Sequence, residues 1–209
     1  DAEFAIRGNP QQGWGYQDWF AAQVPAAPAP GGARLDYGPG FTYAGPVVLP
    51  PGDGDYVLSG YFLPHRYHSH RRNRIRNALR PAQHVIDSVA RQLDEHPAVP
   101  RCSIHVRRDD FMALPHHGFV GEGYYRRALD HIPDGVAMWV FSVDLDWCRH
   151  VFADLRCHFV DGNPAAVDLA LMSACDMHVI GNSSFGWWGA YLGGDGALTI
   201  IPDHINSYM

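Results

Sequence analysis

In the second half of the chain, hydrophobic runs suited to strands alternate with runs whose apolar residues recur every three or four positions. The first kind, rich in β-branched and aromatic residues, predicts buried strands at residues 102–106, 136–142, 157–160, 177–181 and 197–202. The second kind predicts helices at residues 124–132, 147–152, 165–175 and 186–192. This alternation from residue 100 onward is typical of an α/β protein with a parallel, doubly wound sheet, which binds its ligand at the carboxyl ends of the strands.

The first hundred residues have a weaker pattern. They predict two short strands and one helix, at residues 47–49, 56–62 and 81–96. A Pro/Ala/Gly tract at residues 25–32 is typical of a linker. We therefore divide the chain into a short N-terminal region, residues 1–99, and a ligand-binding Rossmann-like domain, residues 100–209.

A turn of small polar residues follows the strand at residues 177–181 and precedes two adjacent tryptophans. Asn and Ser favour turns and helix N-caps, and the free N–H groups at a helix start suit a phosphate. We therefore expect an anion cradle formed by Asn182, Ser183, Ser184 and Phe185. The plainer alternative, which the pattern leaves open, is a buried turn with two core tryptophans.

Two arginines, Arg107 and Arg108, directly follow the strand at residues 102–106. Arginine binds phosphate bidentately, so one of this pair is the leading candidate for a diphosphate ligand. An internal salt bridge to Asp109 or Asp110 is the alternative, and the pattern does not decide between them.

Three further features carry two interpretations each. His105 shares a side of its strand with Arg107, and it is either a core histidine or a hydrogen-bonding partner of a nucleotide. Asp168 opens a helix, where a carboxylate either stabilises the helix dipole or contacts a ligand. The basic run at residues 71–80 is either a solvated face or a positive rim for an anionic ligand.

Composition narrows the classes of function. The net charge is −6 and the pI is near 6.1, which gives no support for nucleic-acid binding. The four cysteines lack a C-x-x-C pair and predict small core residues in a reducing compartment. The sequence contains neither a membrane-span run nor a signal-peptide pattern, so we expect a cytoplasmic location. Because the chain begins at Asp1, a membrane-associated Golgi form stays open if an N-terminal anchor is missing.

Several common catalytic motifs are missing from the sequence. It has no Walker A loop, no G-x-G-x-x-G and no G-x-S-x-G elbow, which disfavours an ATPase, a dinucleotide enzyme and a serine hydrolase of that type. Adjacent histidines at His116 and His117 lack a second ligand set, so we expect neither a metal nor a cofactor.

Four segments together resemble the α-1,2-fucosyltransferases, glycosyltransferase family 11. They are residues 58–62 with Tyr67, residues 105–111, residues 141–148, and residues 168–173 continuing through 182–192. The last segment is the longest and the most specific, and the resemblance covers about residues 56–205.

The resemblance implies a GT-B-like, metal-independent, inverting enzyme that moves fucose from GDP-fucose to a galactoside or other glycan acceptor. It further implies that Arg108 grips the diphosphate, that His105 and Asp168 lie near the nucleoside, and that Ser183, Ser184 and Phe185 surround the phosphates.

Three departures from the family pattern bear on activity. Asp109 replaces a glycine, Val143 replaces an aspartate, and the family's N-terminal glycine-rich loop has no counterpart, so the N-terminal half is short or remodelled. Asp110 is the nearest acidic candidate for a catalytic base, with a structural ion pair as its alternative. The alternative function is a catalytically impaired GDP-sugar-binding or structural descendant, and a transferase for another GDP-sugar is a third possibility.

Overall fold

The computed structural model describes residues 19–21, 33–36, 43, 45–48, 51, 56–59, 65–108, 112 and 120–203. These residues form two compact units, one ending at Ala82 and the other beginning at Gln83. The linker-like tract at residues 25–32 and the acidic pair Asp109 and Asp110 lie outside the described residues. The functional division predicted at residues 99 and 100 stays a prediction.

The first unit contains a small parallel sheet and a basic helical segment. Strand β1 (Ala33–Asp36) pairs with β2 (Tyr56–Ser59), with Ala33 opposite Tyr56. Two 3-10 turns, His65–Tyr67 and Ser69–Arg71, lead into helix α1 (Arg72–Ala78). The sequence predicted β2 but missed β1, and the strand expected at residues 47–49 is wrong because Val47 and Val48 lie outside any strand.

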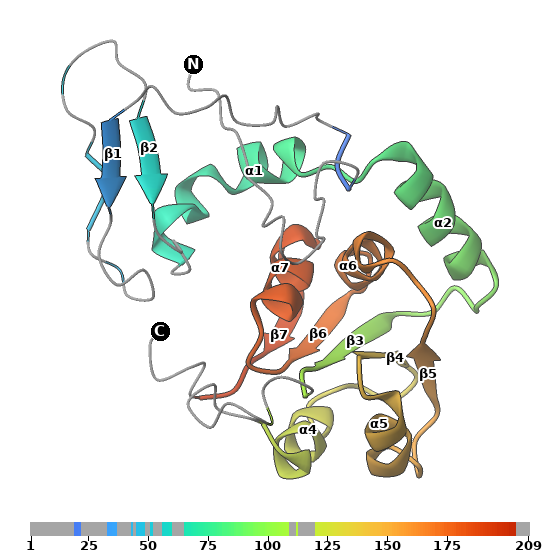
Figure 1. The fold of residues 1–209 in the computed structure, drawn as a ribbon. Coiled ribbons are helices and arrows are strands. Elements are labelled where there is room, and N and C mark those ends of the chain that lie inside the picture. Colours follow the sequence, from blue (N-terminus) through green and yellow to red (C-terminus); the bar gives the residue numbers. More distant parts are fainter. Residues whose placement is uncertain are drawn as a thin grey trace. The chain divides into compact units, whose positions relative to one another are not determined.

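The second unit has the predicted order of strands and helices (Figure 1). After helix α2 (Gln83–Asp94), its elements are β3 (Arg101–Val106), α4 (Glu122–Leu129), β4 (Ala137–Ser142), α5 (Leu145–Val151), β5 (Cys157–Val160), α6 (Ala165–Ser173), β6 (Met177–Ile180), α7 (Ser184–Leu192) and β7 (Leu198–Ile200). All five strands are parallel, in the spatial order β5-β4-β3-β6-β7.

The strand order reverses direction between β3 and β6. From β3 the chain adds β4 and β5 on one side, then returns to add β6 and β7 on the other. A ligand crevice forms at such a switch point, outside the carboxyl ends of the two strands. The fold therefore directs attention to the residues that follow Val106 and Ile180.

Helices cover both faces of the sheet, with α4 and α5 on one side and α6 and α7 on the other (Figure 1). The core between the sheet and α4 and α5 is a hydrophobic cluster that includes Ile104, Val106, Tyr125, Cys148 and Phe152. Each such side chain contributes about 1.5–3 kcal/mol on burial, which holds the sheet and its strand ends in place. All four cysteines are free thiols, as the sequence predicted.

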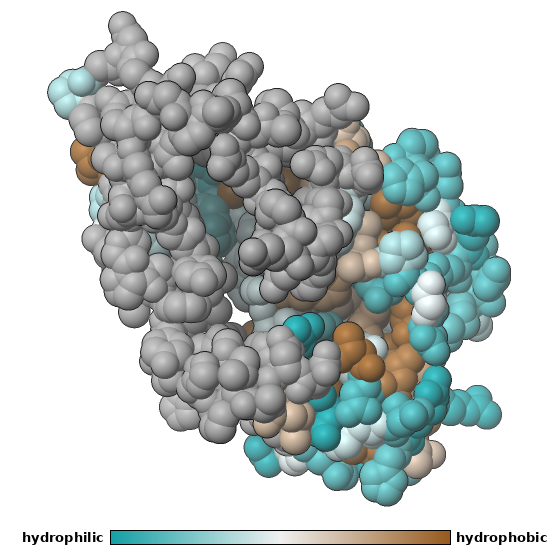
Figure 2. Space-filling model, in the orientation of Figure 1, coloured by the Kyte–Doolittle hydropathy of each residue, from teal (hydrophilic) through white to brown (hydrophobic). Residues whose placement is uncertain are grey.

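The surface over α2 is mostly hydrophilic in Figure 2. Among the residues that the structure describes, no helix combines the length and the apolar character that crossing a membrane requires.

Candidate functional site

The carboxyl ends of β3 and β6 meet at the switch point. His105 lies opposite Ile180 in the parallel register, and the Gly181 N–H donates to the His105 carbonyl at 3.0 Å. Two tyrosine hydroxyls of α4 brace this junction, with Tyr125 donating to the His105 carbonyl at 3.3 Å and Tyr124 to the Ile180 carbonyl at 2.7 Å. The arginine pair and the Asn182–Ser183 turn therefore start from neighbouring points, as the sequence predicted.

Helix α7 begins directly at this junction. Ser183 is its N-cap, in an extended conformation (φ −149°, ψ 130°), and its side chain makes no capping hydrogen bond. Ser184 and Phe185 lie in the first turn of the helix, because α7 begins at Ser184 and not at residue 186 as the sequence predicted. The N–H groups of a first helical turn have no partner within the helix, so this turn is suited to an anion.

Two glycines let α7 approach its neighbours closely. A Cβ added at Gly186 would lie 2.7 Å from Nδ1 of His105, and one at Gly189 would lie 2.8 Å from Cβ of Met172 on α6. Real Cβ atoms do not come this close, so both positions require glycine for the observed packing. The glycines thus fix the start of α7 against the end of β3.

His105 is buried, with 5% of its surface exposed, and its ring lies 5.7 Å from that of Phe185. Burial, assisted by the charge of Arg107, lowers the pKa of His105 to about 4. The imidazole is therefore neutral near pH 7. Its Nδ1 has no hydrogen-bond partner among the described residues.

Arg107 and Arg108 directly follow β3. Arg108 donates from Nε to Oδ2 of Asp144 at 2.8 Å, and its guanidinium lies 4.3 Å from the ring centroid of Trp147 on α5. Arg107 is close enough to His105 for its charge to lower the pKa of that imidazole. Arg108 is thus engaged by α5, while the charge of Arg107 acts on the histidine that packs against α7.

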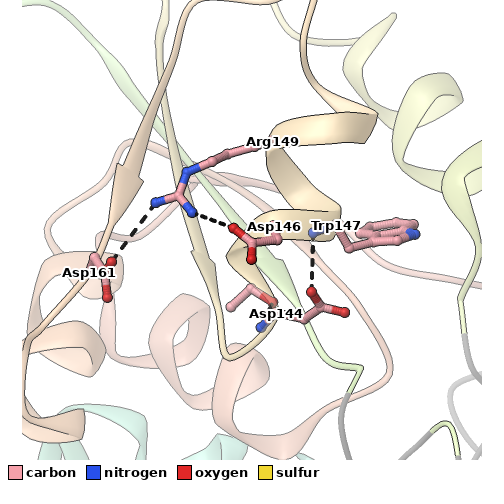
Figure 3. Close-up of polar contacts among 6 residues, drawn as sticks. Asp144, Asp146, Trp147, Arg149 and Asp161 are labelled. Atoms are coloured by element: carbon pink, nitrogen blue, oxygen red, sulfur yellow. Dashed lines mark hydrogen bonds and ion pairs between the residues drawn. The ribbon is translucent and has the colours of Figure 1, made fainter.

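Asp144 is the carboxylate that the sequence interpretation missed. It caps α5 by accepting from the Trp147 N–H at 3.1 Å (Figure 3), and its own N–H donates to Oγ of Ser142. The Trp147 N–H and then Arg108 lower the pKa of Asp144 below its ordinary value. A salt bridge was one alternative for the arginine pair, and Arg108 forms one with Asp144.

The pairing of β3 with β4 explains why Arg108 and Asp144 are in contact. Val106 lies opposite Ser142 in that register, and Arg108 and Asp144 each follow two residues later. The sequence shows both positions, but only the strand order shows that they are neighbours.

Asp168 lies in the first turn of α6, which packs against α7. It is half-buried and accepts from Nδ2 of Asn163 at 3.1 Å. Burial raises the pKa of Asp168 to about 6. This carboxylate is more desolvated than one that only stabilises a helix start on the surface.

Taken together, the described site offers two arginines after β3, the first turn of α7, a neutral histidine and a half-buried carboxylate in the first turn of α6. Among the described residues no group of three metal-ligating side chains is placed to hold a metal ion. Asp110 lies outside the described residues, so its role stays a prediction.

The fold and sequence both match known glycosyltransferases. The chain resembles the crystal structure of NodZ α-1,6-fucosyltransferase soaked with GDP-fucose, with a TM-score of 0.52 at 14% identity, over 70% of this chain and 54% of that one. This likeness shows the fold and confirms the α/β, GT-B-like class. A family model described as glycosyl transferase family 11 matches residues 51–208, so the chain belongs to that family.

Two sequence relatives carry α-1,2-transferase names. The chain is 33% identical to an α-1,2-colitosyltransferase of Escherichia coli over 71% of this chain and 56% of the relative. It is 31% identical to galactoside α-(1,2)-fucosyltransferase 1 of Aotus azarae over 73% of this chain and 48% of the relative. The chain thus spans about half the length of these relatives.

Proposed function

We propose that this chain carries the donor-binding part of a glycosyltransferase that moves fucose from GDP-fucose to a sugar hydroxyl in α-1,2 linkage. The observation that carries the proposal is the switch point, where the 3.0 Å bond between Gly181 and His105 joins the strand end before the arginine pair to the strand end before α7. The names of the relatives support the linkage, and the fucosyltransferase structure soaked with GDP-fucose supports the donor.

In this proposal Arg107 makes the direct contact with the diphosphate. Its charge acts on His105, which packs against the start of α7, whereas the family resemblance assigns the grip to Arg108, whose Nε donates to Asp144. We give Arg108 a supporting role as a second fixed positive charge at the strand end. Ser183, Ser184 and Phe185 then present the first-turn N–H groups to the phosphates.

Transfer proceeds with inversion and without a metal in this proposal. The sugar passes through an oxocarbenium-like state while negative charge builds on the departing GDP. Preorganised donors stabilise such charge because they do not have to reorient during the reaction. Arg107, Arg108 and the start of α7 supply those donors here.

The nucleoside is assigned to His105 and Asp168. A carboxylate accepts well from the N–H groups on the edge of a guanine ring, and the neutral imidazole offers a hydrogen bond without opposing charge. Asp110 is the candidate base that activates the acceptor hydroxyl, and galactosides are the candidate acceptors because a relative is named for them.

Two alternatives share the nucleotide site but differ in chemistry. Asp109 places a negative charge beside the arginines, which favours an impaired descendant that binds GDP without transferring sugar. The colitosyltransferase relative favours a different GDP-sugar.

Donor turnover separates these functions. The chain is incubated with GDP-fucose, GDP-colitose, GDP-mannose and UDP-sugars, with and without galactoside acceptors and EDTA, and released nucleotide is measured. Release of GDP from GDP-fucose that resists EDTA and depends on acceptor is the expected result. Preferential turnover of GDP-colitose supports the second donor, and GDP binding without any turnover supports the impaired descendant.

A further inference from the structure

Three polar side chains from separate elements form a continuous chain of hydrogen bonds that ends at Asp168. Gln92 on α2 and Asn163 before α6 form a reciprocal amide pair, with Nε2 of Gln92 donating to Oδ1 of Asn163 at 2.9 Å and Nδ2 of Asn163 donating back at 3.2 Å. The same Nδ2 donates to Oδ1 of Asp168 at 3.1 Å. Because an ionised carboxylate only accepts, the amide group of Asn163 must turn its NH₂ toward Asp168.

The chain uses only one oxygen of Asp168. Oδ1 accepts from Asn163, and within the described part of the chain Oδ2 accepts no hydrogen bond. Oδ2 is also absent from the fully buried polar atoms that lack a partner, so it stays accessible. An accessible carboxylate oxygen, whose neighbouring Oδ1 is held by Asn163, is suited to a ligand with N–H donors.

We propose that Asn163, itself fixed by Gln92, is a positioning residue that turns Asp168 toward the base of the nucleotide and so selects guanine. This inference rests on the proposed GDP-sugar site and extends it to residues that contact Asp168 rather than the nucleotide. Guanine presents N–H donors on its N1 and N2 edge, hypoxanthine presents only the one on N1, and adenine presents an acceptor at N1. A carboxylate fixed in direction distinguishes these three patterns because a mismatch leaves a buried group unpaired.

The charges around Asp168 leave Asn163 as its main source of stabilisation. Asp161 raises the pKa of Asp168 by like charge, and Arg149 lies 3.9 Å from Asp161 (Figure 3). The charged residues of α2, Asp87, Arg91 and Asp94, are exposed, and α7 carries no acidic or basic residue. The hydrogen bond from Asn163 opposes the effect of burial and lowers the pKa of Asp168.

The test measures binding of GDP, IDP and ADP between pH 5 and pH 8 for the wild type and for Asn163→Leu. For the wild type, affinity should follow GDP over IDP over ADP, and GDP affinity should fall as the pH drops through about 6, where Asp168 becomes protonated. Asn163→Leu removes the hydrogen bond that stabilises the ionised form of Asp168, so the pKa of Asp168 rises. The midpoint of the pH dependence of GDP affinity therefore moves to higher pH. We expect GDP binding at pH 7 to weaken by roughly three- to tenfold, and the ratio of GDP to IDP affinity to fall.

Gln83→Leu is the matched control, because it removes an exposed amide of the same helix that donates to Asp87 at 2.7 Å. It should leave the midpoint and the base preference unchanged. Gln92→Leu keeps the Asn163 donor but frees it to rotate, and it should give a smaller shift in the same direction. If Asn163→Leu does not fold, Gln92→Leu takes its place in the same measurements.

Unchanged pH midpoint and base preference in both Asn163→Leu and Gln92→Leu overturn the inference. Absence of GDP binding by the wild type overturns the proposed function instead. A titration of the Asp168 carboxyl by carbon-13 NMR distinguishes the two failures, because it reports the coupling of Asn163 to Asp168 without any nucleotide.

Discussion

Gly186 on α7 and His105 on β3 are in such close contact that a single added methyl group does not fit between them. The added Cβ would lie 2.7 Å from Nδ1 and 3.0 Å from Cγ of the imidazole. The contact sets the distance between the helix start and the end of the strand, and therefore the geometry of the proposed anion site.

Gly186→Ala should displace α7 or force the His105 ring to move. Overpacking of this kind costs about 1–3 kcal/mol. We expect a lower free energy of unfolding in urea together with weaker GDP binding. Gly194→Ala is the control, since a Cβ there meets nothing within 4 Å and should change neither quantity. Equal behaviour of the two variants would contradict the packing described here.

Asp144→Asn should weaken the hold on Arg108 while keeping a side-chain oxygen for the Trp147 N–H. The Arg108 side chain is 15% exposed and that of Asp144 is 37% exposed, so the loss should exceed that of a surface pair, which is about 0–1 kcal/mol. Asp146→Asn serves as the control. It removes an exposed ion pair with Arg149 within the same helix, α5. Thermal unfolding of both variants measures the difference, and an equal change in melting temperature would count against an anchoring role for Asp144.

The Asp144 pair should also contribute to acid sensitivity. The pKa of Asp144 is lowered in the folded state. The pair therefore contributes fully to stability above the ordinary aspartate pKa, about 4, and this contribution disappears as the pH falls through the folded pKa. Urea titrations of Asp144→Asn between pH 5 and pH 2.5 should therefore show a shallower loss of stability than the wild type. A parallel pH dependence for the two proteins would refute this linkage.

His178 should make the fold sensitive to mildly acidic pH. It is fully buried on β6, its Nδ1 lies 2.8 Å from Oγ of Ser103, and burial lowers its pKa to about 4. The unfolded chain takes up this proton near pH 6.5, so stability falls between about 6.5 and 4 and levels off below. His178→Asn should reduce the slope of unfolding free energy against pH by the equivalent of about one proton. His84→Asn, at an exposed position of α2, should leave it unchanged.

The sequence predicted the order of elements in the second unit because hydrophobic period and turn chemistry are local. It also singled out as candidates the arginine pair and the turn at Asn182 and Ser183, since each directly follows a buried strand, and His105 within the first of those strands. It missed Asp144 as the partner of Arg108, because that contact depends on β4 lying next to β3. The Gln92 and Asn163 pair, 71 residues apart, was beyond reach for the same reason.

Titration of GDP into the wild type, Arg107→Ala and Arg156→Ala, followed calorimetrically, tests the central claim most directly. Arg156 is exposed and precedes β5, at the opposite end of the sheet from the proposed site. The account predicts that GDP binds the wild type and Arg156→Ala alike, and that Arg107→Ala loses at least tenfold in affinity. Equal GDP affinity for all three proteins, or none for the wild type at millimolar GDP, would contradict a diphosphate site between the end of β3 and the start of α7.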